Sequence, residues 1–161
     1  MRTVVIGLGS PILSDDSVGL RVIRELSGRN HTGVTFVEAH SGGLSLLEEM
    51  TCADRVILVD ASLAASLEPG EVSVAGICSE SLNVVNSHDC TLEQTLLLGR
   101  TVGLILPPDD RITVVAIGVK DVSSFGETLS PVVAAAIPVA CATVIAILEG
   151  AHLLSLEAVN A

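Results

Sequence analysis

Three groups of side chains in this sequence could bind a metal ion or move a proton. Asp15 and Asp16 are adjacent, Asp60 follows a run of four apolar residues, and His88 precedes an amphipathic segment. Carboxylate and imidazole groups are ligands that suit nickel, zinc or non-haem iron, and a carboxylate can also act as a general base. The three positions are dispersed along the chain, so a metal site here requires a fold that brings them together.

Each candidate also has an ordinary structural explanation. Asp16 can cap the helix that follows it or interact with the dipole of that helix. Asp60 can form a turn at the end of a strand. His88, taken alone, is typical of a surface histidine beside a helix start. Cys90, two residues after His88, is the one thiol near a candidate site.

The segments around these residues alternate between strand and helix patterns. Residues 3–8 are apolar almost throughout, as in a strand that is covered on both faces, and residues 18–26 place their apolar side chains on one helical face. Similar patterns predict strands at 33–39, 55–60, 71–75 and 112–119, and helices at 44–50, 92–102 and from Ser130 onward. In the helix at 44–50 we expect Leu44, Leu47 and Met50 to point inward. Residues 79–86 fit either a loop or a short strand.

This alternation predicts an α/β fold with a mostly parallel sheet and helices on both faces. The loops at the carboxyl ends of parallel strands gather at one edge of such a sheet. Asp15 and Asp16 follow the first strand, Asp60 ends the third, and His88 lies in a loop before a helix. We therefore expect all of them at the same sheet edge.

The composition suits one domain, residues 1–161, with a tail after residue 150 whose order is uncertain. Hydrophobic residues make up 49% of the chain and aromatic residues only 1%, so the predicted core is aliphatic. The formal net charge of −11 argues against nucleic acid and anionic membranes as partners. Four isolated cysteines, and an N-terminus that runs directly into a strand, predict reduced thiols in a cytoplasmic protein.

Residues 131–148 carry no charge and reach the length of a membrane span. The segment is rich in alanine and opens with Ser130-Pro131, a typical helix start with proline in the first turn. We expect a buried helix of a soluble domain, and a single peripheral span is the alternative.

The glycines of Gly7-Leu8-Gly9 suggest a dinucleotide-binding turn, but the rest of that motif is missing. The motif needs a third glycine where this chain has Ile12. The sequence also has no Walker lysine and no Gly-x-Ser-x-Gly elbow. We expect no nucleotide cofactor.

Taken together, the short motifs of this chain resemble those of the hydrogenase maturation endopeptidases, over about residues 3–150. The motifs are Gly7-Leu8-Gly9-Ser10, Asp15-Asp16, Val59-Asp60-Ala61, Pro69-Gly70-Glu71, Ser87-His88, Gly118-Val119 and Leu129-Ser130-Pro131. The resemblance implies a three-layer α/β/α sandwich with a twisted sheet of about five strands. It also implies an endopeptidase that removes the C-terminal extension of a nickel–iron hydrogenase large-subunit precursor after nickel insertion.

The same resemblance implies a metal contact through Asp16, Asp60 and His88, with nickel supplied by the substrate. The family usually has Asn at the position of Ser10 and Gly at the position of Ser17. The turn after the second strand is expected to face the substrate with His40, Gly42 and Gly43.

Two mechanisms and one different activity remain open at this stage. A bound metal ion could polarise the scissile carbonyl and activate a water molecule, with Asp16, or Asp15 beside it, as the general base. Alternatively, nickel only positions the substrate and another group performs the chemistry. The different activity is that of a nickel-dependent chaperone that binds the hydrogenase precursor without cleaving it.

Overall fold

The computed structural model describes residues 1–29, 31–77 and 91–150. Its strands are β1 (Thr3–Leu8), β2 (Val34–Ala39), β3 (Arg55–Ser62), β4 (Val72–Gly76) and β5 (Ile112–Gly118). They form one five-stranded sheet in the order β2-β1-β3-β5-β4. All neighbouring strands are parallel except β4, which is antiparallel to β5. The predicted mostly parallel sheet of about five strands is confirmed.

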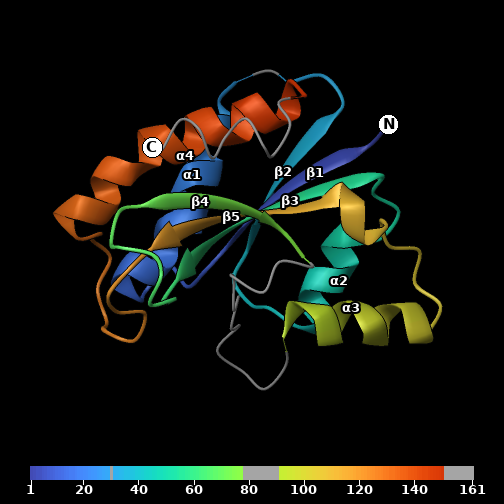
Figure 1. Ribbon diagram of the computed structural model, residues 1–161, viewed down its shortest axis with the longest axis horizontal. Helices are drawn as coiled ribbons and strands as arrows, with labels where there is room; N and C mark the ends of the chain where they lie inside the picture. The colour runs from blue at the N-terminus through green and yellow to red at the C-terminus, as the bar shows by residue number, and fades with distance from the viewer. Residues whose placement is uncertain (30, 78–90, 151–161) are drawn as a thin grey trace.

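Helices cover both faces of this sheet (Figure 1). Helices α1 (Val18–Ser27) and α4 (Pro131–Leu148) lie on one face, and α2 (Leu44–Met50) and α3 (Leu92–Thr101) lie on the other. Short 3-10 helices precede α1 (η1, Ser14–Ser17) and β5 (η2, Asp109–Arg111). The molecule is therefore the predicted three-layer α/β/α sandwich.

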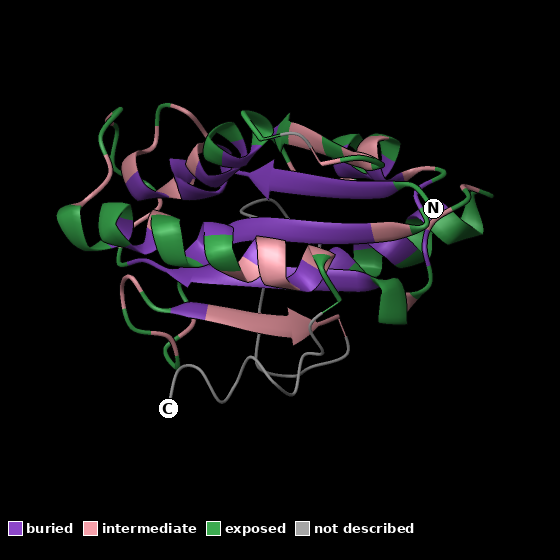
Figure 2. Ribbon diagram, turned by 90° about the horizontal axis from the view of Figure 1, so that it is seen from above, coloured by how far each residue is buried: buried purple, intermediate pink, exposed green. Residues whose placement is uncertain are grey.

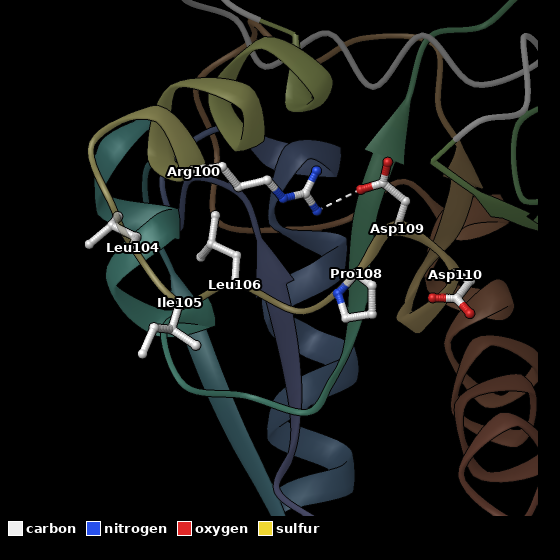
Figure 3. A pocket seen from close by; sticks show the side chains of 7 residues that line it. All are labelled: Arg100, Leu104, Ile105, Leu106, Pro108, Asp109 and Asp110. Atoms are coloured by element: carbon white, nitrogen blue, oxygen red, sulfur yellow. Dashed lines mark hydrogen bonds and ion pairs between the residues drawn. The ribbon is translucent and has the colours of Figure 1, made fainter.

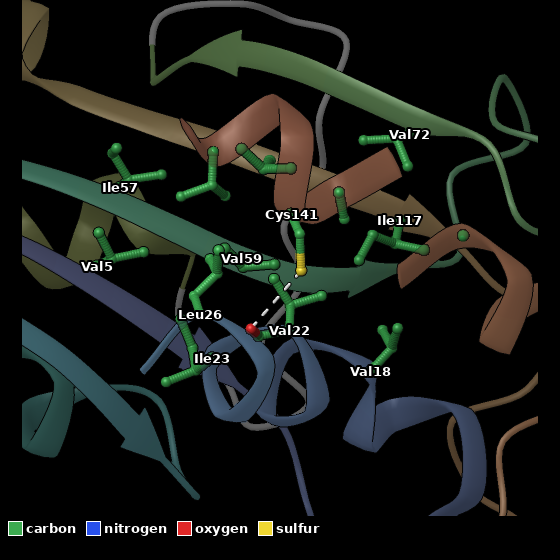
Figure 4. Close-up of a cluster of buried hydrophobic side chains, with 14 of the residues drawn as sticks. Val5, Val18, Val22, Ile23, Leu26, Ile57, Val59, Val72, Ile117 and Cys141 are labelled. Atoms are coloured by element: carbon green, nitrogen blue, oxygen red, sulfur yellow. Dashed lines mark hydrogen bonds between the residues drawn. The ribbon is translucent and has the colours of Figure 1, made fainter. Parts of the chain in front are cut away.

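Two aliphatic clusters fill the space between the layers, because alternate residues of each strand point to opposite faces. In β1, Val5 packs with α1 and α4, whereas Val4 and Ile6 pack with α2 and α3. Cys141 of α4 lies in the first cluster, where its thiol donates to the carbonyl oxygen of Val22 at 3.9 Å (Figure 4). The central strands are buried along their length, and the edge strand β4 is only partly buried (Figure 2).

Helix α4 is long and apolar enough to cross a membrane, with 18 residues, a mean hydropathy of 2.4 and 33% of that window buried. Core helices of soluble proteins also meet these criteria. The buried side chains of α4 recur every three or four positions and pack in the cluster on α1 and β5: Val133, Ala136, Ala140, Cys141, Val144 and Ile147. This face of α4 lies in the core, as predicted, but the helix is not buried all round, because the opposite face exposes Val132 and Val139.

Two details differ from the sequence prediction. Strand β3 extends to Ser62 rather than ending at Asp60, because β5 continues beside it and pairs with Ala61 and Ser62. Leu44 was predicted to point inward but is 65% exposed, and Leu46 is buried instead. The ambiguous segment 79–86 lies outside the described residues.

Candidate active site at the carboxyl edge of the sheet

The turn after β1 holds the carboxylate of Asp16 in place. The backbone N–H of Ser10 donates to Oδ2 of Asp16 at 2.8 Å, and the backbone N–H of Asp16 donates to the carbonyl of Leu13 at 2.8 Å. Gly9 makes this path possible, because its φ is +145° and a Cβ there would collide with the carbonyl oxygen of Asp16. The residues at the start of this turn, Gly9 and Ser10, thus hold Asp16 in position.

The other two glycines of this region allow β1 and α1 to approach closely. A Cβ on Gly7 would collide with the carbonyl oxygen of Gly19, and a Cβ on Gly19 would collide with the carbonyls of Leu8 and Val59. The start of α1 therefore lies against the carboxyl ends of both β1 and β3. Gly7, which had suggested a nucleotide site, instead allows α1 to pack against β1, and Gly19 allows the same helix to reach β3.

Asp60 lies near the end of β3 with only 8% of its surface exposed. One carboxylate oxygen accepts from the backbone N–H of Ala61 at 2.8 Å. Burial raises the pKa of Asp60 to about 7, and the negative charge of Asp16 contributes to that rise. Burial also raises the pKa of Asp16, opposed by its hydrogen bond from Ser10. The structure thus brings the two predicted acids together in a site where burial disfavours the ionised form of both carboxyl groups.

This pair of acids has no basic partner within the part of the chain that the structure describes. The ion pairs found there join Arg24 and His40 to Glu38, and Arg100 to Asp109. A divalent cation would offset the repulsion between the two carboxylates, and carboxylate oxygens suit such an ion. Two acids alone do not make a closed metal site, and residues 1–29, 31–77 and 91–150 contain no group of three or more His, Cys, Asp or Glu side chains arranged around a metal position. The third predicted ligand, His88, lies outside the described residues, as do Cys78 and Cys90.

Asp15 has a different environment from its neighbour. Its Oδ1 accepts from the backbone N–H of Ser130 at 2.6 Å, and its Oδ2 accepts from the Ser130 hydroxyl at 2.8 Å. Asp15 therefore joins the turn after β1 to the start of α4. Both carboxylate oxygens of Asp15 are engaged in this contact.

Ser17, where the resemblance implies glycine, fits this turn. Ser17 is 1% exposed, and its hydroxyl donates to the carbonyl of Ser14 at 2.7 Å. Ser10, where the resemblance implies asparagine, contacts Asp16 through its backbone N–H. Neither serine disturbs the contact that holds Asp16.

The turn after β2 lies beside the acid-bearing turn. The backbone N–H of Gly9 donates to the carbonyl of Ala39 at 3.2 Å, which joins the two turns. His40 follows directly and is exposed, with Nε2 at 3.8 Å from Oε2 of Glu38. Gly42 and Gly43 complete the turn before α2. His40, Gly42 and Gly43 thus lie at the sheet edge where they were predicted.

One further part of this region, the segment 121–130, contains none of the predicted site residues. This segment pairs with the turn after β1 through a parallel bridge between Leu13 and Gly126. A Cβ on Gly126 would lie 2.6 Å from Oγ of Ser14, so a larger residue there would require the Ser14 side chain to move. Gly126 is the one residue in this segment that could have indicated a close contact, but its partner Leu13 is more than a hundred residues away in the sequence.

A pocket of about 650 Å³ lies elsewhere, between α3 and the segment before β5 (Figure 3). Within it, Arg100 bonds Oδ1 of Asp109 at 2.6 Å and the carbonyl of Pro107 at 2.9 Å. The segment precedes β5, so the pocket is at the amino edge of the sheet, opposite Asp60. Its one ion pair is satisfied internally, and we assign it no chemistry.

The fold and the acidic pair define a small α/β/α protein with its candidate site at the carboxyl ends of β1 and β3. The family model of hydrogenase maturation proteases matches residues 20–147. The chain therefore belongs to the hydrogenase maturation protease family, a family of peptide hydrolases. Asp60 and His88 fall within the matched residues, whereas Asp16 precedes them.

Relatives and solved structures agree with this assignment. Hydrogenase 2 maturation protease of Escherichia coli is 29% identical over 76 residues, which is 46% of this chain and 46% of that protein. The structure of the hydrogenase maturating endopeptidase HybD from E. coli is 25% identical, covers 92% of this chain and 93% of its own, and superposes with a TM-score of 0.75. The [NiFe] hydrogenase maturation protease HybD from Thermococcus kodakarensis has the same fold, with a TM-score of 0.64 at 23% identity over 91% of this chain and 99% of its own.

Proposed function

We propose that this protein is the endopeptidase that removes the C-terminal extension of a [NiFe]-hydrogenase large-subunit precursor once nickel has been inserted. The observation that carries the proposal is the pair Asp16 and Asp60, held together at the sheet edge with raised pKa values and no described basic partner. A family of hydrogenase maturation proteases supplies the class of reaction. The nickel ion belongs to the precursor, so it is part of the substrate.

In this proposal the two acids select a precursor that carries its metal ion. The repulsion between their carboxylates is relieved when a cation lies against them, so a metal-loaded precursor binds better than an empty one. His88 is the proposed third contact, on the resemblance of the sequence alone.

Asp16 is the proposed general base for the attacking water. A base with a raised pKa accepts a proton more readily than an ordinary aspartate does, and burial raises the pKa of Asp16. Asp16 is partly exposed, whereas Asp60 is buried. The proposed division of roles is therefore that Asp16 meets the water and that Asp60 supports the cation contact.

Co-expression with the hydrogenase large subunits of the same genome tests the proposal. We expect one of them to migrate faster in gel electrophoresis when this protein is present, and mass spectrometry to find that its C-terminal extension has been removed. A stable complex with a precursor of unchanged mass would instead support the non-cleaving chaperone. Absence of both trimming and complex formation with every large subunit would contradict the proposal.

A further inference from the structure

A pair of exposed apolar side chains lies beside the acid-bearing turn. Phe125 is 84% exposed and Ile12 is 53% exposed, although Phe125 is one of only two phenylalanines in the chain. Phe125 directly precedes Gly126, whose backbone N–H donates to the carbonyl of Ile12, so the two apolar residues come from backbone segments that lie against each other. We call these two residues the Ile12–Phe125 patch.

The loop that presents Phe125 is fixed on several sides. The backbone N–H of Gly126 donates to the carbonyl of Ile12 at 2.9 Å, and the backbone N–H of Ser14 donates to the carbonyl of Gly126 at 2.8 Å. Arg21 of α1 donates to the carbonyl of Glu127 at 2.6 Å. These bonds hold the loop against both η1 and α1.

The loop is also bonded internally and at its far end. The Asp121 carboxylate accepts from the backbone N–H and the hydroxyl of Ser123, each at 2.7 Å, and from the hydroxyl of Ser124. Ser130, at the other end, is held by Asp15. Phe125 is therefore an exposed aromatic side chain on a preorganised loop, and such side chains bind partners with a small loss of conformational entropy.

The position of the patch indicates its partner. Ile12 lies in the same short turn as Asp16, and the carbonyl of Leu13 accepts from the backbone N–H of Asp16. A folded precursor whose metal ion reaches Asp16 must lay its surface over the neighbouring residues of this turn. Leu63, one residue beyond the carboxyl end of β3, is a further exposed apolar side chain at that edge, at 57%.

We infer that the Ile12–Phe125 patch is a docking surface for an apolar segment of the hydrogenase large-subunit precursor, next to its metal site. The inference rests on the proposed function for the identity of the partner. The acid pair attracts the cation by charge. The Ile12–Phe125 patch adds an apolar contact on a chain that is otherwise strongly acidic, with a net charge of −11.

The test compares Phe125→Ala with Ile105→Ala. Ile105 is a matched control because it is 71% exposed and lies with the pocket at the opposite edge of the sheet. Nickel-loaded precursor is bound to immobilised protein to obtain Kd, and its processing is followed against precursor concentration to separate KM from kcat. Phe125→Leu tests whether another apolar side chain restores binding, and thermal unfolding confirms that each variant is folded.

We expect Phe125→Ala to weaken precursor binding and raise KM by about tenfold, which is typical for loss of an aromatic contact, with kcat unchanged. Phe125→Leu should recover part of the affinity, and Ile105→Ala should behave as wild type. Wild-type binding by Phe125→Ala, equal weakening by both alanine variants, or a lower kcat at unchanged KM would overturn the inference. If the wild-type protein binds the precursor without cleaving it, the proposed processing fails, and the Kd values still decide whether the patch docks the precursor.

Discussion

The Asp60 carboxyl group lies close enough to Asp16 that the charge of Asp16 adds to the effect of burial, and together they raise the pKa of Asp60 to about 7. A protein that served only its own stability would gain from separating these groups or from pairing one with a base. Their juxtaposition is therefore the clearest structural sign of a functional site in this chain.

This relationship predicts a pH-dependent cost in the metal-free protein. Between pH 3.8 and about 7, native Asp60 keeps a proton that the unfolded chain has already lost. The free energy of unfolding should therefore fall as the pH rises through this window, by at most about 1.4 kcal/mol per pH unit from this group, and level off above it. The asparagine side chain of the Asp60→Asn variant cannot ionise, so the stability of this variant should lack this pH dependence.

Urea unfolding of wild type and Asp60→Asn across that pH range measures the effect. The stability of the variant relative to wild type should increase steadily toward neutral pH. Parallel stability profiles for the two proteins would show that Asp60 does not titrate with a raised pKa.

Asp15 is expected to contribute to stability and to the position of the site. Asp15→Ala leaves the N–H and hydroxyl of Ser130 without their acceptor, so we expect a loss of about 1–3 kcal/mol in the free energy of unfolding. Asp110→Ala, at an exposed position, is the control and should change little. Chemical denaturation measures both variants, and equal stabilities would contradict a structural role for the contact between Asp15 and Ser130.

Gly9 is expected to be required for the acid-bearing turn. Gly9→Ala forces a side chain into a left-handed conformation and against the carbonyl of Asp16, so we expect a loss of about 1–3 kcal/mol and impaired processing. Gly28→Ala is the matched control, because the nearest atom to its added Cβ is 4.0 Å away and its φ is −72°. Melting temperatures that are equal in the two variants would show that the turn tolerates a side chain.

His88 is expected to be necessary for processing but not for folding. His88→Ala should keep the melting temperature of wild type and lose cleavage of nickel-loaded precursor, because a proposed metal contact is removed. Asn86→Ala, two residues earlier in the chain, is a control for general effects of mutation in this segment. Wild-type processing by folded His88→Ala would exclude the histidine from the site.

The sequence was sufficient for the parts of the fold that depend on local patterns. The apolar runs predicted β1 and β5, and the edge rule for parallel sheets predicted that Asp16 and Asp60 would meet. The extension of β3 to Ser62 was not predictable from its own residues, because it depends on pairing with β5. The same limit applies to the contacts of Asp15 with Ser130 and of Leu13 with Gly126, which join segments more than a hundred residues apart.

The central claim is that Asp16 acts in the cleavage of a nickel-loaded hydrogenase precursor. The most direct test is the electrophoretic mobility of that precursor after incubation with wild-type protein or with Asp16→Asn, whose folding is verified by thermal unfolding. Wild type should convert the precursor to the shorter form, and folded Asp16→Asn should leave it uncut. Full conversion by Asp16→Asn at the wild-type rate would contradict the account.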